Sequence, residues 1–147
     1  MPLDKTVYDN FIRELEIVNV TIPSASWQLF DFPPNEITIR NEIEFHLEDT
    51  ILSEDRSLVT IPAKLRLTGK GDDEGKKFYE IFLLQHMTVA INPEHSSEEI
   101  LEAYIHRNAL LTMVPVFREQ VKYACFQMGI PPLILPALKL IASKEES

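Results

Sequence analysis

The segment from Met113 to Leu140 has the sequence MVPVFREQVKYACFQMGIPPLILPALKL. Its first half has apolar residues at helical spacing. Pro115 suits the first turn of this helix, and Gly129 suits the position just beyond its end, where prolines prevent continuation. A helix that is apolar around most of its girth is buried on both sides or packs against another copy of the chain. The apolar positions are Val114, Phe117, Val121, Ala124 and Met128, widened by Val116, Tyr123 and Phe126.

Three segments upstream have the pattern of β-strands. Residues 36–48 and 59–68 alternate apolar and polar side chains, which predicts half-solvated antiparallel strands. Pro62 lies on the outward side of the second strand and indicates an edge or a bulge. The third strand, residues 78–91, has one apolar face and adds Phe78, Phe82 and Leu84 to the other.

The flanking segments complete the order of elements. Asp4 is a candidate cap for a short amphipathic helix, and Ser96 with Glu99 forms a capping box for another helix that ends near Asn108. Residues 15–22 are rich in β-branched side chains, which predicts a strand buried on both faces and stopped by Pro23. Residues 24–36, SASWQLFDFPPNE, are predicted to form an aromatic loop.

This order predicts a single α+β domain over residues 1–147. We expect a four-stranded antiparallel meander with two C-terminal helices on one face. Residues 1–14 form a short N-terminal helix or arm in this scheme, and residues 141–147 form a short polar tail.

The composition narrows the classes of function. The chain has 147 residues, with 23 acidic and 14 basic side chains and a net charge of −9. This balance argues against binding nucleic acid, which needs a basic patch. Cys125 is the single cysteine, and the chain has neither the apolar core of a signal peptide nor a membrane-length apolar run. We therefore expect a cytoplasmic protein.

Few residues suggest catalytic or metal chemistry. His46 lies between Glu44 and Glu48 on one strand face, but such acids are expected to pair with Lys64 and Arg66 across the hairpin. Glu102 and His106 share a helix face without an HExxH motif, and Cys125 is expected to be a buried structural thiol. We expect no enzyme, no cofactor, no catalytic residue and no metal site. The positions left to explain are apolar.

The excess of apolar side chains points to binding surfaces. One set, expected to bind polypeptide clients, is Trp27, Phe30, Phe32, Phe78, Phe82 and Leu84. A second set, expected at an oligomer interface, is Phe117, Val121, Tyr123 and Phe126. An oligomer interface, a client groove or both would explain the excess. Two alternatives to a polypeptide-binding protein remain. One is a small-molecule-binding protein or enzyme with an apolar pocket, and the other is a purely structural subunit of an oligomer.

Two segments resemble the SecB-type protein-export chaperones. PVFRE at Pro115–Glu119 resembles the start of a helix in that family, and the similarity continues through Gly129 to the tail LILP. KFYEIFLLQHMTVAI at Lys77–Ile91 resembles the family's long strand. The resemblance covers roughly residues 15–140 and identifies the chain as a divergent SecB-like protein.

This resemblance implies a function. It implies a homotetramer, assembled as a dimer of dimers, that holds unfolded polypeptides in apolar grooves without ATP. Trp27, Phe30 and Phe32 would border the groove, and Phe78 and Glu80 would lie near the surface that engages the SecA motor. The chain departs from export-type members where they carry acidic docking residues, because Asn19 and Pro23 are neutral and the acidic tail is reduced to KEES. Some family members instead serve as dedicated chaperones of the antitoxins of toxin–antitoxin systems, which is the alternative for this chain.

Overall fold

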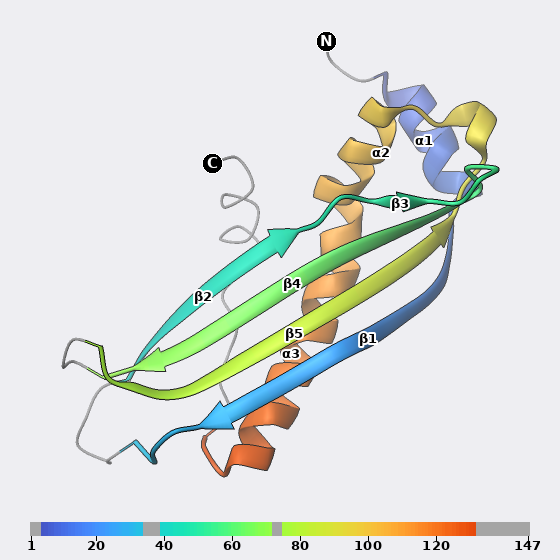
Figure 1. Ribbon diagram of the computed structural model, residues 1–147. Coiled ribbons are helices and arrows are strands. Elements are labelled where there is room, and N and C mark those ends of the chain that lie inside the picture. Colours follow the sequence, from blue (N-terminus) through green and yellow to red (C-terminus); the bar gives the residue numbers. More distant parts are fainter. Residues whose placement is uncertain (1–3, 34–38, 72–74, 132–147) are drawn as a thin grey trace.

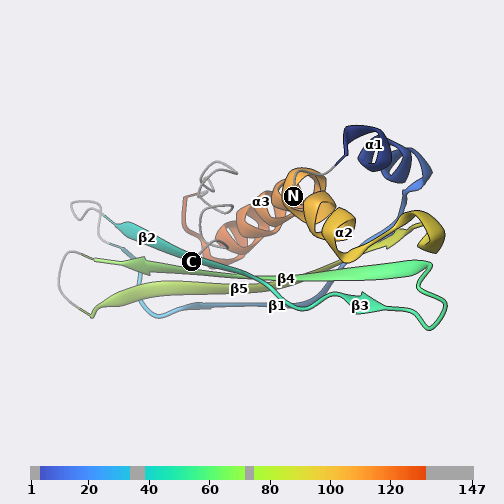
Figure 2. The ribbon, with the colours of Figure 1, turned by 90° about the horizontal axis from the view of Figure 1, so that it is seen from above.

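The computed structural model describes residues 4–33, 39–71 and 75–131. One antiparallel sheet has helices on one of its faces, as Figures 1 and 2 show. The α+β class is confirmed. No helix in the described ranges is long and apolar enough to cross a membrane. The elements are α1 Lys5–Glu14, β1 Glu16–Leu29, β2 Arg40–Leu47, β3 Ile51–Leu52, β4 Leu58–Lys70, β5 Lys77–Ala90, η1 Pro93–His95, α2 Glu98–Tyr104, η2 Ile105–Ala109 and α3 Leu110–Met128.

The strand order is β1-β5-β4-β2, with the short β3 also paired to β4. Strands β2, β4 and β5 form the predicted meander. β1 joins the sheet beside β5, at the edge opposite β2, instead of beside β2. The alternation of apolar residues fixes which face of a strand is buried, but it does not fix the neighbouring strand.

The core lies between the sheet and α3. The residues predicted to face inward from β4 and β5 are buried, and Phe45 of β2 meets Phe117 of α3 edge to face with 6.0 Å between ring centroids. Gln85 is a fully buried polar side chain in this layer, and its Nε2 donates to the Met113 carbonyl at 3.0 Å. Burying these side chains under α3 holds helix and sheet together.

The first strand departs from prediction in two ways. Pro23 does not end it, since β1 continues to Leu29 and takes in part of the predicted aromatic loop. The register against β5 shifts between Thr21 and Ser24, and a terminal strand with such a bulge tolerates proline. β1 is also not buried on both faces, because Ile17 and Val18 are half exposed at the edge of the sheet.

Pro62 is not at an edge of the sheet, because β4 lies between β5 and β2. It sits where the neighbour of β4 changes from β2, which ends opposite Ala63, to β3, which begins opposite Thr60. The Pro62 carbonyl accepts from the Glu48 backbone N–H at 2.9 Å. The missing N–H of proline therefore falls at a break in the ladder.

The helical region is more continuous than predicted. Ser97, one residue later than predicted, caps α2 by accepting from the Ile100 N–H. The chain then passes through the π-helical turn η2 directly into α3, so that Pro115 lies inside α3 and does not start it. Pro115 has no N–H to donate to the Leu111 carbonyl, so its effect falls within α3 and not in η2.

The end of α3 is as predicted. Gly129 has φ 73°, in the left-handed region, and its N–H donates to the Phe126 carbonyl. The Ile130 N–H donates to the Cys125 carbonyl at 3.1 Å, which completes a Schellman motif.

Asp55 organises the turn between β3 and β4 and gives a testable pKa. Its Oδ1 accepts from the Ser57 hydroxyl at 2.7 Å, the Ser57 N–H at 3.1 Å and the Ser53 hydroxyl at 2.8 Å. These hydrogen bonds lower the pKa of Asp55 to about 2, and the bond from the Ser57 hydroxyl contributes most. The turn is therefore stabilised above the ordinary aspartate pKa of about 3.9, and this contribution is lost as the pH falls through about 2.

We expect an NMR titration of the Asp55 carboxyl carbon to give this low midpoint, and Ser57→Ala to raise it. An ordinary aspartate midpoint in the wild-type protein would contradict the hydrogen-bonded turn.

Candidate functional site

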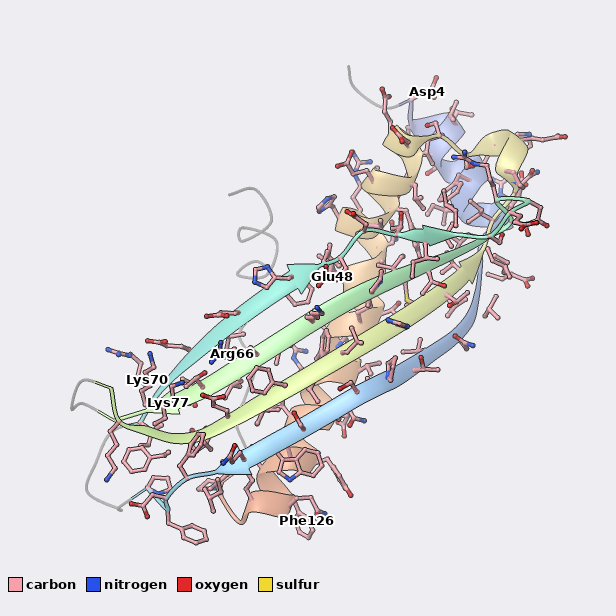
Figure 3. All side chains as sticks on the ribbon, viewed as in Figure 1. Asp4, Glu48, Arg66, Lys70, Lys77 and Phe126 are labelled. Atoms are coloured by element: carbon pink, nitrogen blue, oxygen red, sulfur yellow. The ribbon has the colours of Figure 1, made fainter. Side chains whose placement is uncertain are left out.

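Aromatic side chains gather where β1 and α3 both end. We call Trp27, Phe30, Phe32, Tyr123 and Phe126 the aromatic patch. The last four are between 47% and 79% exposed, which is unusual for such large apolar side chains. Figure 3 shows Phe126 at the C-terminal end of α3, pointing away from the sheet. Such a concentration marks a binding surface more often than an idle one.

Specific contacts join the two halves of the aromatic patch. Trp27 of β1 packs edge to face on Tyr123 of α3, with 5.7 Å between ring centroids. Phe32 lies beside Gly129, 3.7 Å from where a Cβ would project. Tyr123 and Phe126 are three residues apart and share one helix face. The Schellman turn at Gly129 therefore leaves room for Phe32 beside them.

A groove of about 640 Å³ lies between the β2–β3 edge and the helical segment from α2 to η2. Its apolar lining comes from both sides of the groove. Four of its seven ionisable side chains are carboxylates. The strand β2, which forms one side of the groove, is a terminal strand of the described sheet. The apolar residues are Phe45, Leu47, Leu52, Ile61, Ile91, Leu101 and Ile105, and the ionisable ones are His46, Glu48, Asp49, Arg56, Glu98, Glu102 and His106.

The face of the sheet away from the helices carries the remaining candidates. Phe82 is 42% exposed there and Leu84 is partly exposed, but Phe78 is 1% exposed. The Phe78 ring packs beside Gly71, and Lys76 lies over it at 5.2 Å. The prediction that Phe78 adds accessible apolar area is therefore wrong for this chain.

Glu80, the other residue that the resemblance places near a motor, is already paired. Its Oε1 lies 2.7 Å from Lys77 Nζ and 3.6 Å from Arg66 Nη2. The hydrogen bond from Lys77 lowers the pKa of Glu80, against the effect of partial burial. The negative charge of the Glu80 carboxylate is therefore compensated by Lys77 and Arg66 of the same chain.

The set predicted for an oligomer interface divides in two. Phe117 and Val121 are fully buried in the core of the single chain, so their assignment to an interface is wrong. Tyr123 and Phe126 are exposed on the same helix and belong to the aromatic patch. A helix packed on a sheet buries the stripe that faces the strands, and Tyr123 and Phe126 lie outside that stripe.

The polar candidates have ordinary surroundings. Glu48 pairs with Lys64 at 2.8 Å as expected, whereas Arg66 pairs with Glu80 and not with Glu44. Within the ranges described, no three His, Cys, Asp or Glu side chains are close enough to hold a metal ion. Cys125 is fully buried. Glu102 and His106 do share a face, and it is the face that lines the groove.

The fold is found in a known chaperone. The SecB-like chaperone Rv1957 of Mycobacterium tuberculosis, in complex with a ChAD peptide from the Rv1956 HigA1 antitoxin, superposes with a TM-score of 0.78. The two chains are 16% identical, and the match covers 90% of this chain and 96% of that one. The chain has a SecB-like fold. This confirms, for the fold, what the sequence resemblance implied.

Other comparisons add less. A protein of unknown function from Streptococcus agalactiae is similar with a TM-score of 0.42 and 12% identity, covering 84% of this chain and 98% of that one. No protein-family model matches the sequence, and no curated protein matches it.

Sequence patterns did not reveal the groove. The face shared by Glu102 and His106 and the alternation of β2 were both visible, but no local pattern places α2 opposite the β2–β3 edge. The pairing of Trp27 with Tyr123 was also missed, because Trp27 was assigned to a loop and Tyr123 to an interface. Both features depend on how α3 crosses the sheet.

Proposed function

We propose that this protein is an ATP-independent chaperone that holds unfolded or unassembled polypeptides in the cytoplasm. The observation that carries the proposal is the aromatic patch, in which four large rings at one end of the molecule are about half exposed or more. The groove supplies a second surface, whose lining mixes apolar side chains with the carboxylates of Glu48, Asp49, Glu98 and Glu102. The SecB-like fold supports the proposal, because the similar chaperone was solved with a bound peptide.

Binding would use the apolar segments that an unfolded client exposes. Each square ångström of apolar surface removed from water contributes about 25 cal/mol. Contacts at the aromatic patch and in the groove would add through their shared attachment to one client chain. The outward backbone groups of β2 could pair with an extended segment without regard to its sequence.

The charges near the sheet favour a dedicated client over the export motor. Glu80 is neutralised by Lys77 and Arg66, and the residues near the other expected docking positions, Asn19 and Pro23, are uncharged. We therefore favour an antitoxin-like client over a SecA partner.

We also propose that the protein forms a homo-oligomer, as the resemblance implies. The half-exposed Ile17 and Val18 on terminal strand β1 are the apolar residues best placed to meet a second copy.

The proposal is tested by light scattering from a denatured client diluted into buffer without nucleotide. Wild-type protein is expected to suppress aggregation at near-stoichiometric amounts. Phe30→Ser with Phe126→Ser is expected to reduce this suppression several-fold, because two exposed anchors are removed. We avoid Trp27 in this variant because it packs on Tyr123.

Leu111→Ser is the matched control, since Leu111 is an exposed apolar residue of α3 outside the aromatic patch. Equal suppression by wild-type protein and the double variant would contradict the role of the patch. Failure of wild-type protein with every client, antitoxins included, would contradict the chaperone proposal.

A further inference from the structure

Helix α1 lies beside α2 at one end of the molecule, on the helical side of the sheet (Figures 1 and 2). It is amphipathic, and Tyr8 and Phe11 are its buried residues. The Phe11 ring meets the Tyr104 ring of α2 edge to face, with 6.0 Å between ring centroids. Tyr104 is only 3% exposed as a result of this packing. Helix α1 therefore covers apolar surface of α2 at Tyr104.

The first half of α1 is held by polar contacts from the π-helical turn η2. The Tyr8 hydroxyl donates to the side-chain carbonyl of Asn108. The Arg107 guanidinium lies over the Tyr8 ring, 5.3 Å from its centroid. Both partners belong to η2, which joins α2 to α3, and π-helical turns within helices are frequent at functional sites. The irregular turn of the helix is thus the part of it that binds α1.

The end of α1 is held by a second polar link, to η1. The Glu14 carboxylate accepts a hydrogen bond from Asn92 Nδ2 at 2.6 Å, and its other oxygen lies 2.7 Å from His95 Nδ1. The hydrogen bonds from Asn92 and His95 lower the pKa of Glu14. The side chains of Glu14 and His95 are partly exposed, and exposed pairs of this kind contribute little stability. The link therefore positions the end of α1 without fixing it strongly.

Helix α1 has the features of an element that opens separately from the core. A helix of ten residues is marginal by itself in water, so its stability comes from its packing. Two of its residues are buried, whereas β4 and β5 bury most of theirs. Segments with few buried apolar contacts open at a lower free energy than the core. Opening of α1 would uncover Phe11 and Tyr104 while the sheet and α3 stay packed.

We propose that α1 is a displaceable cover, whose release offers Tyr104 of α2, with Tyr8 and Phe11 of α1 itself, to an apolar segment of a client. This inference rests on the proposed chaperone function. The client segment competes with α1 for the same surface, so that α1 shields the aromatic rings from water until a client replaces it. The covered surface is separate from the aromatic patch, which lies at the other end of α3.

Amide hydrogen exchange of the full chain tests the separate opening of α1. The α1 amides are expected to exchange at least about tenfold faster than the buried amides of β4 and β5. Glu14→Gln weakens the link to η1, and Tyr8→Phe removes the hydroxyl that binds Asn108 but keeps the covering ring. Each variant is expected to speed exchange in α1 several-fold and to leave exchange in β4 and β5 unchanged.

Asp9→Asn is the matched control for Glu14→Gln, since it removes one carboxylate from an exposed position of the same helix. Exchange of the α1 amides as slow as that of the core strands would overturn the proposal. So would equal acceleration by Asp9→Asn and Glu14→Gln, because the link to η1 would then have no part in holding α1.

Light scattering from a denatured client tests whether the uncovered surface binds. Glu14→Gln and Tyr8→Phe are expected to halve, at least, the amount of protein needed for half-maximal suppression of aggregation, because a larger open fraction raises the apparent affinity. If these variants open α1 but suppress no better than Asp9→Asn, the uncovered surface does not bind clients, and this inference fails while the chaperone function stands. Loss of suppression by every protein, the wild type included, would contradict the chaperone function and the client-binding part of this inference with it.

Discussion

Replacing Phe117 with alanine is expected to lower the free energy of unfolding by about 3–5 kcal/mol. The side chain is fully buried between the sheet and α3, where it meets Phe45 edge to face. Its removal leaves a cavity in the layer that joins helix and sheet, and neighbouring side chains fill such a cavity only in part. Urea unfolding followed by circular dichroism measures the change.

Phe126→Ala is the matched control, since it deletes the same ring from the same helix at a position that is 79% exposed. We expect it to change the free energy of unfolding by less than about 0.5 kcal/mol. A Phe117→Ala protein that keeps its stability but loses its assembly would restore the interface role predicted for Phe117. Equal losses for both variants would contradict the placement of α3 on the sheet.

Gly69→Ala is expected to lower the free energy of unfolding by about 1–3 kcal/mol. Gly69 of β4 lies directly opposite Tyr79 of β5, and a Cβ at Gly69 would overlap the Tyr79 ring. The ring cannot move away easily, because its hydroxyl donates to the Asn41 side chain at 2.6 Å. Gly69 has no side chain, so the Tyr79 ring packs directly on the backbone of β4 at this position.

A double-mutant cycle with Tyr79→Ala tests this cause. In the Tyr79→Ala background the ring is absent, so Gly69→Ala is expected to cost much less than in the wild-type protein. Additive losses would show that the cost of Gly69→Ala comes from elsewhere in the strand. Urea midpoints of the four proteins, compared at a common slope, decide between the two results.

The buried faces of the central strands could be predicted because strand geometry is local. Successive side chains point to opposite faces, so the alternation in residues 59–67 predicts which side chains of β4 are buried, whichever strands lie beside it. The end of α3 is local in the same way. Gly129 reaches the left-handed conformation without steric cost, and the cap needs only the preceding turn.

Elements that depend on distant neighbours were predicted less well. Pro23 predicts the end of a strand and Pro62 an edge or a bulge, yet Pro23 lies at a register shift in β1 and Pro62 where the neighbour of β4 changes from β2 to β3. Whether a missing N–H matters depends on what lies across from it, and the sequence does not contain that information.

The candidate site shows the same division between local and tertiary information. The amino-acid sequence shows that this acidic chain has more large apolar residues than its polar chemistry explains, and for most of them it predicts the strand or helix on which they lie. Which of them are exposed to water follows from the packing of the whole chain. Phe117 and Phe126 lie on one helix, and Phe78 and Phe82 on one strand, yet one of each pair is buried and the other exposed. For Phe117 and Phe126, exposure depends on how α3 crosses the sheet, which joins segments far apart in the chain. For Phe78 it depends on Gly71 and Lys76, whose contacts cover the ring.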